Sequence, residues 1–150
     1  LFDYIYSTFQ AFDTNPENVE FEVTESAYLE NFALSNKFFK RVGNMGCAIA
    51  LDDFGTGYSS LSYLTQINID TLKIDRQFVM EIQTSERSRL VTGAIIDLAK
   101  RLSLLVCAEG IENKEQWHYL MEHGCDHVQG FFFSKPVPLE DLLTTPTTIS

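Results

Sequence analysis

Polar and apolar side chains along the chain follow two periods, one typical of strands and one typical of helices. Residues 19–23 alternate apolar and acidic side chains, the pattern of a strand with one buried face. Short apolar runs bounded by glycine or polar residues predict four more strands, at residues 47–51, 71–74, 104–108 and 126–129. Helical spacing and capping signals predict helices at residues 1–12, 31–44, 85–102, 113–124 and 139–143, and a short one capped by Ser59 or Ser60 that runs through Leu64.

The clearest predicted helix, residues 85–102, carries an apolar stripe. Side chains three and four positions apart fall on one side of a helix, and an apolar side normally faces the core. We therefore expect the stripe to be buried. Its members are Leu90, Val91, Ala94, Ile95, Leu98 and Leu102.

Strands and helices alternate without a hairpin signal, which predicts a parallel sheet with crossover helices. A polar residue lies at the end of each predicted strand: Glu22, Asp52, Lys73, Glu109 and Gln129. The carboxyl ends of parallel strands meet at one face of a β/α barrel, where that fold places its chemistry. We predict an α/β fold, a partial TIM-type β/α barrel to which this chain gives five of eight strands.

Charge and composition limit the partners. Acidic residues outnumber basic ones by 21 to 11, a net charge of −10, which opposes binding to DNA. Three cysteines, Cys47, Cys107 and Cys125, are expected to be reduced thiols. No apolar run reaches the roughly 18 residues that span a bilayer, and no signal sequence opens the chain. We expect a cytoplasmic domain, whose parent protein could still be membrane-anchored.

The acidic residues at the strand ends indicate a metal site. Glu22, Asp52, Asp53 and Glu109 would repel one another at short range unless cations neutralised them. Oxygen ligands suit Mg²⁺, Mn²⁺ or Ca²⁺, and a carboxylate such as Asp52 could bridge two ions, an arrangement that cleaves phosphodiesters. Lys73 could neutralise charge beside the attacked phosphorus without binding a metal.

Five motifs span nearly the whole chain. They are EVTES at 22–26, DDFGTGYSSL at 52–61, KIDRQFV at 73–79, AEGIE at 108–112 and QGFFFSKP at 129–136. In type and order they resemble the carboxyl-terminal part of the EAL domain family, the bacterial cyclic di-GMP phosphodiesterases. The resemblance implies hydrolysis of cyclic di-GMP to linear pGpG with Mg²⁺ or Mn²⁺ in second-messenger signalling.

The resemblance also implies roles for single residues. Glu22, Asp52 and Asp53 would be metal ligands in a two-metal site. Lys73 and Glu109 would assist the catalytic water, and Asp53 would serve the second metal in catalysis.

Two further positions carry roles implied by the family. Gln129 would contact the substrate, and Glu25 would steady the loop from Asp53 to Ser59, which the family links to metal binding and dimerisation. The implied partners are therefore cyclic di-GMP and a second copy in a homodimer. Sensory or diguanylate-cyclase domains are possible elsewhere in the parent protein.

Two departures from the family pattern matter. The Glu-Ala-Leu tripeptide is absent, and so is the strand that supplies an asparagine ligand. We expect a single fragment over 1–150, with a connector at 1–18, β/α repeats at 19–143 and a tail at 144–150. Alone, this fragment would lack the complete metal site, and its five strands could not close a barrel.

Other readings of the same residues stay open. Asp52 and Asp53 could simply cap the following turn. Gly55 and Gly57 imitate a dinucleotide-binding loop, and residues 53–55 imitate a kinase triplet, without the rest of either motif. Lys73 could be a structural buried cation. Residues 131–133, three phenylalanines, could stack on a guanine or pack against the protein.

Three functional classes follow. A hydrolase is favoured because each motif position present carries the catalytic residue type. The alternative is a cyclic di-GMP receptor without catalytic activity, and the third class is a regulatory module that only mediates dimers. The missing glutamate would discriminate between the first two.

Overall fold

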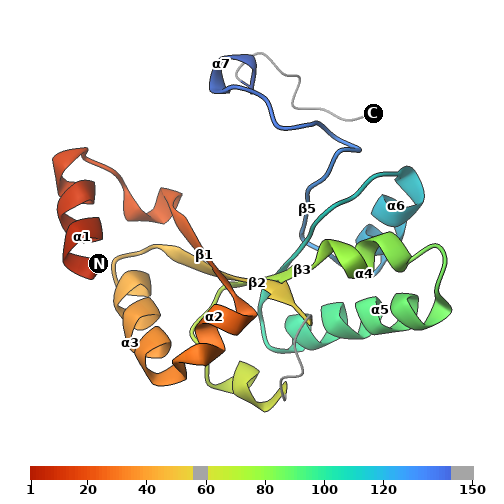
Figure 1. The fold of residues 1–150 in the computed structure, drawn as a ribbon, viewed down its shortest axis with the longest axis horizontal. Helices are drawn as coiled ribbons and strands as arrows, with labels where there is room; N and C mark the ends of the chain where they lie inside the picture. The colour runs from red at the N-terminus through yellow and green to blue at the C-terminus, as the bar shows by residue number, and fades with distance from the viewer. Residues whose placement is uncertain (56–60, 143–150) are drawn as a thin grey trace.

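The computed structural model describes residues 1–55 and 61–142. At its centre lies a sheet of five parallel strands in the order β1-β2-β3-β4-β5 (Figure 1). The strands are β1 (Glu20–Thr24), β2 (Ala48–Phe54), β3 (Thr71–Ile74), β4 (Leu105–Ala108) and β5 (His127–Val128). The predicted α/β fold with five parallel strands is confirmed.

Helices precede, connect and follow the strands. The helices in the described residues are α1 (Phe2–Ala11), α2 (Glu25–Glu30), α3 (Phe32–Gly43), α4 (Arg76–Glu81), α5 (Glu86–Arg101), α6 (Lys114–Glu122) and α7 (Leu139–Leu142), with 3-10 turns η1 (Pro16–Asn18) and η2 (Leu61–Thr65). Two of them, α2 and α4, were not predicted. The sequence pattern missed α2 and α4 because six residues are too few to show a helical period. Each follows a strand directly and is capped by a side chain, Thr24 for α2 and Asp75 for α4.

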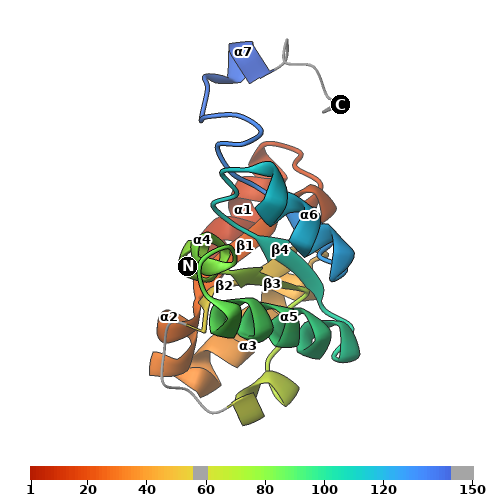
Figure 2. The same ribbon diagram turned by 90° about the vertical axis from the view of Figure 1, so that its right-hand side faces the viewer.

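The two faces of the sheet differ in polarity. One face packs against the helices, with α2, α3 and α5 along one side of the sheet in both views (Figures 1 and 2). Its strand residues, with helix residues such as Tyr28 and Ile96, form the core. Side chains alternate along each strand, so the other face carries the intervening residues, which are mostly polar: Glu20, Glu22, Asp52, Thr71, Lys73, Cys107 and His127.

Two aspartates repeat one contact at the amino ends of the strands. Asp70 lies before β3, and its backbone N–H and Oδ2 bond the carbonyl and the N–H of Ile49 in β2. Asp126 lies before β5 and makes the same pair of bonds to Val106 in β4. Each aspartate therefore extends a strand ladder and fixes the register of the neighbouring strand at the end opposite the predicted site.

The prediction that the apolar stripe of α5 is buried is largely wrong. Ser85 caps the helix as predicted, but its buried residues are Thr92, Gly93, Ile96 and Ala99. Leu90 is 66% exposed and Val91 39% exposed, and Ala94 is exposed, while Ile95, Leu98 and Leu102 are only partly buried. The buried side is turned from the expected one because α5 also packs against α6, where a Cβ at Gly93 would lie 3.1 Å from the hydroxyl oxygen of Tyr119.

Several smaller expectations can be compared with the described residues. Among those residues, Cys47, Cys107 and Cys125 are free cysteines, and Cys47 and Cys125 are buried. The predicted cap at Ser59 or Ser60 and the tail at 144–150 lie outside the described residues. Within residues 1–55 and 61–142, no helix combines the length and the hydropathy needed to cross a lipid bilayer.

Candidate functional site

Lys73 is the centre of a cluster of charged side chains on the polar face of the sheet. It lies on β3 and is 5% exposed. Its Nζ lies 2.5 Å from Oε1 of Glu109, 2.8 Å from Oε2 of Glu22 and 3.7 Å from Oδ1 of Asp52. These carboxylates come from β1, β2 and the residue after β4. Acids far apart in sequence therefore converge on one ammonium group.

Gln129 joins the same cluster from the residue after β5. Its Nε2 donates to Oε1 of Glu109 at 2.7 Å, so this oxygen accepts from both Gln129 and Lys73. All five polar residues predicted at the strand ends are thus brought together at one edge of the sheet. The convergence follows from the parallel order of the strands.

Neighbouring carboxylates stabilise the protonated form of Lys73. Burial acts to lower the pKa of Lys73, but hydrogen bonds to Glu109 and Glu22, with the attraction of Glu109 and Asp52, outweigh burial and raise the pKa. The ammonium group therefore stays protonated across the physiological pH range. It neutralises part of the carboxylate charge around it.

An irregularity in β2 sets the backbone conformation at Asp52 and Asp53. The register with β3 shifts between Leu51 and Phe54, where β2 has one more residue than its partner, as in a β-bulge. Asp53 lies inside this bulge with φ of 55°, and its N–H donates to Oδ1 of Asp52 at 2.9 Å. Bulges commonly redirect side chains beside active sites. Sequence reasoning ended the strand at Leu51 and missed the bulge.

The environment of Asp53 disfavours its negative charge. Burial raises the pKa of Asp53, the negative charges of Asp52 and Asp75 and a hydrogen bond with Asp75 raise it further, and the positive charge of Lys73 opposes them. A bound cation would relieve this repulsion. The electrostatics of the turn are therefore compatible with a cation site.

Glu25 supports this turn from α2. It is 4% exposed, and its Oε2 accepts the N–H of Gly55 at 3.1 Å while its Oε1 accepts the hydroxyl of Tyr63 at 2.6 Å. The predicted contact of Glu25 with the loop after Asp53 is thus seen at Gly55. Residues 56–60 of that loop lie outside the described residues.

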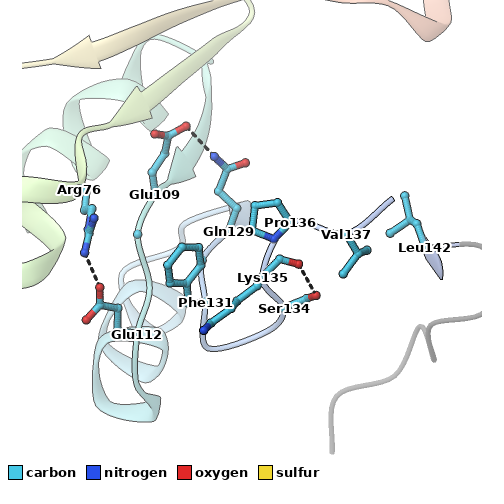
Figure 3. A pocket seen from close by; sticks show the side chains of 12 residues that line it. Arg76, Glu109, Glu112, Gln129, Phe131, Ser134, Lys135, Pro136, Val137 and Leu142 are labelled. Atoms are coloured by element: carbon cyan, nitrogen blue, oxygen red, sulfur yellow. Dashed lines mark hydrogen bonds and ion pairs between the residues drawn. The ribbon is translucent and has the colours of Figure 1, made fainter. Parts of the chain in front are cut away.

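A cavity of about 640 Å³ opens beside Glu109 and Gln129 (Figure 3). Its wall includes an ion pair between Arg76 Nη2 and Glu112 Oε1 at 2.5 Å, and the side chain of Lys135. Sequence reasoning did not select Arg76 or Glu112 as site residues. Each comes three residues after a predicted strand-end residue, and that spacing was the available signal.

Of the three consecutive phenylalanines, two pack against the protein and one is exposed. Phe132 and Phe133 pack on Trp117, with ring centroids 6.0 and 6.3 Å away. Phe131 is 59% exposed and lines the cavity. Packing therefore holds the loop, and one ring is available for a ligand.

The donor atoms of the cluster suit a hard divalent cation. Carboxylate oxygens of Glu22, Asp52 and Asp53 are the ligand type that Mg²⁺ and Mn²⁺ prefer. Across the described part of the chain, no group of three or more His, Cys, Asp or Glu side chains has an arrangement that could hold a metal ion. The chemistry of these residues fits such an ion, while their described arrangement is centred on Lys73.

Comparison with known proteins finds clear relatives. Residues 1–136 match the profile of a family described as the EAL domain. The chain is 44% identical over 124 residues to the cyclic di-GMP phosphodiesterase NbdA of Pseudomonas aeruginosa, covering 83% of this chain. It spans only 16% of the length of that protein.

Solved structures agree with this comparison. The PaMucR phosphodiesterase in complex with cyclic di-GMP superposes with a TM-score of 0.89 at 36% identity, covering 93% of this chain and 57% of that one. BlrP1 of Klebsiella pneumoniae, in complex with manganese and cyclic di-GMP, gives a TM-score of 0.82 at 34% identity, covering 89% of this chain and 34% of that one.

Proposed function

The chain belongs to the EAL domain family, and we propose that it forms part of a phosphodiesterase that hydrolyses cyclic di-GMP to pGpG. The observation that carries this proposal is the convergence of Glu22, Asp52, Glu109 and Gln129 around Lys73. The relative NbdA is named as a cyclic di-GMP phosphodiesterase, and PaMucR was solved with that ligand.

Glu22, Asp52 and Asp53 are the residues that we assign to metal binding. Their oxygens suit Mg²⁺ or Mn²⁺, and the BlrP1 complex contains manganese. A divalent cation at this position would supply Lewis acidity, polarising the phosphate and making a nearby water more acidic.

The reaction itself divides among residues of this chain. To give pGpG, a water oxygen bonds to phosphorus, the bond from phosphorus to the 3′ oxygen breaks, the water loses a proton and the 3′ oxygen gains one. Lys73 and Glu109 hold the attacking water, since their 2.5 Å pair presents a donor and an acceptor side by side. We assign Asp53, whose pKa is raised mainly by burial, to the second metal of the same centre.

The substrate would occupy the cavity beside Glu109. Gln129 orients Glu109 and faces this cavity, and the cationic side chains of Arg76 and Lys135 line it. Cations beside an otherwise acidic site suit a ligand with two phosphates. Phe131 offers an exposed ring to a guanine base.

The organisation of the whole protein is part of the proposal. We assign residues 19–143 to the β/α repeats of the domain, 1–18 to a connector and 144–150 to a tail. Because the chain spans a small part of its curated relatives, we propose sensory or diguanylate-cyclase domains in the full-length protein, and the family resemblance leads us to propose a homodimer. We propose the same cytoplasmic placement that the sequence favours.

The deciding experiment is hydrolysis of cyclic di-GMP by the full-length protein with Mg²⁺, with Mn²⁺ and with a chelator. We expect pGpG to form only with a divalent cation. Turnover in the presence of the chelator would contradict the metal assignment, and no turnover with either cation would contradict the hydrolase.

A cyclic di-GMP receptor without activity is the second candidate. The observation that favours it is the neutralisation of Glu22, Asp52 and Glu109 by Lys73, which gives these carboxylates a partner other than a metal ion. A receptor would bind cyclic di-GMP in the presence of chelator and leave it intact over many hours with Mg²⁺ or Mn²⁺.

A further inference from the structure

The turn after Asp53 is held by contacts on two sides. Gly55 has φ of 91°, which favours glycine, and a Cβ there would lie 2.9 Å from the ring of Phe78. On the other side, the N–H of Gly55 donates to Oε2 of Glu25. The backbone two residues after Asp53 therefore lies between a ring and a carboxylate.

The carboxylate of Glu25 is itself held by a second donor. The hydroxyl of Tyr63 donates to its Oε1 at 2.6 Å, the shorter of the two bonds. Gly55 and Tyr63 flank residues 56–60 in sequence, so one buried carboxylate connects both sides of that segment. Tyr63 contributes a part-buried hydroxyl that reaches Glu25 across 38 positions of sequence.

We propose that Tyr63 is a positioning residue for the metal-binding turn, acting through Glu25 and the N–H of Gly55; this inference rests on the proposed function. Its hydroxyl fixes the orientation of the Glu25 carboxylate, and the other oxygen of that carboxylate then holds Gly55. Asp53, two residues earlier, is thereby kept at the left-handed φ that the bulge requires.

Tyr63 can hold Glu25 in place because a buried carboxylate that lacks a hydrogen-bond donor costs free energy. A buried carboxylate that loses a hydrogen-bond donor turns toward another donor or toward water. If Glu25 turned in this way, the N–H of Gly55 would lose its acceptor. The turn from Asp53 to Gly55 could then sample other conformations without any change in the core of the protein.

The test compares Tyr63→Phe with Tyr119→Phe in the full-length protein. Both changes remove one hydroxyl from a ring and keep its packing. The hydroxyl of Tyr119 donates to the carbonyl of Arg89 in α5, also at 2.6 Å, and in the described part of the chain it makes no bond to Glu25 or Gly55. Tyr119→Phe therefore measures the general effect of losing a buried hydroxyl.

Three quantities are measured. They are hydrogen exchange at the Gly55 amide in chelator, the Kd for Mn²⁺, and kcat with KM for cyclic di-GMP. We expect Tyr63→Phe to speed exchange at Gly55 at least tenfold, weaken Mn²⁺ binding about fivefold to twentyfold and lower kcat, with KM within about twofold of wild type. Tyr119→Phe should leave the three quantities within about twofold.

The outcomes separate this inference from the proposed function. Unchanged Gly55 exchange in Tyr63→Phe, or equal changes in both variants, would overturn the role of Tyr63. A wild-type protein that neither binds Mn²⁺ nor hydrolyses the substrate would overturn the proposed function, while the exchange measurement would still test the contact. If Tyr63→Phe does not fold, Glu25→Gln replaces it, because its amide keeps one acceptor oxygen and should raise Gly55 exchange similarly.

Discussion

Lys73, on β3, and Glu109, the residue after β4, form the shortest ion pair of the cluster around Lys73, with 2.5 Å between Nζ and Oε1. The same oxygen accepts a hydrogen bond from Gln129. Two donors on one oxygen hold the Glu109 carboxylate in one orientation. The pair is therefore a fixed element of the site, around which the other acidic side chains are arranged.

Replacing Lys73 with Met should destabilise the fold. The change keeps an unbranched side chain but leaves three carboxylates without their common cation. We expect the free energy of unfolding in chelator to fall by about 2–3 kcal/mol, less than for a fully buried pair because Glu22 is half exposed. Urea denaturation gives the value. Lys40→Met, at an exposed position of α3, is the control, and equal stability of the two variants would contradict the prediction.

Asp52→Ala should remove catalysis while Glu20→Gln should not. Both acids lie on the polar face, but Asp52 pairs with Lys73 and is assigned to the metal, whereas Glu20 accepts a hydrogen bond from Thr71. We expect Mg²⁺-dependent kcat to fall by about 10³-fold or more for Asp52→Ala and to stay within about threefold for Glu20→Gln. Near-normal turnover in Asp52→Ala would count against the assigned role.

Asp126 should make stability depend on pH. Burial acts to raise the pKa of Asp126, but the hydrogen bonds from Lys100 and the Val106 N–H, with the charge of Lys100, outweigh it and lower the pKa. A lowered folded pKa gives stability that is present above the unfolded pKa, near 4, and is lost as pH falls through the folded value.

Asp126→Asn should therefore lose stability at pH 7, and its difference from wild type should shrink as the pH falls below about 4. Urea unfolding at several pH values measures this difference. Asp97→Asn, at an exposed position of α5, should show no comparable trend. A difference that stayed constant from pH 7 to pH 3 would argue against the ionic origin.

Two glycines should respond in opposite directions to alanine. A Cβ at Gly130 would lie 2.2 Å from the carbonyl oxygen of Ile111, so the backbone beside Gln129 would have to move. A Cβ at Gly43, in α3, meets nothing closer than 3.7 Å. We expect Gly130→Ala to cost about 2–4 kcal/mol and Gly43→Ala to gain up to about 1 kcal/mol, as measured by thermal or urea unfolding. A stable Gly130→Ala protein would mean that this loop adapts easily.

The sheet could be predicted because its signal is local. Residues 71–74 were predicted as a strand and form β3 with the same limits. The helix predicted at residues 113–124 is also present as α6, and Asn113 and Gln116 form a capping box at its start. In both places a short pattern and the tertiary structure favour the same conformation, so the sequence alone was sufficient.

Contacts between distant segments could not be predicted in the same way. The buried side of α5 depends on how the helix packs against α6 and the core, and the exposure of Leu90 follows from that packing. The Arg76–Glu112 pair joins the first residue of α4 to a residue 36 positions later, and the spacing of each from a strand end gives no sign that the two side chains meet. The family resemblance supplied the roles of the site residues, and those roles remain predictions.

The bulge in β2 has a consequence for how two neighbouring acids can end a buried strand. In an uninterrupted ladder, consecutive side chains point to opposite sides, so one of Asp52 and Asp53 would be driven among the hydrocarbon side chains behind the sheet. The extra residue before Phe54 breaks that alternation. Deleting either aspartate would restore regular pleating, place the remaining acid on the polar face between the core residues Leu51 and Phe54, and leave the strand end with one carboxylate instead of two.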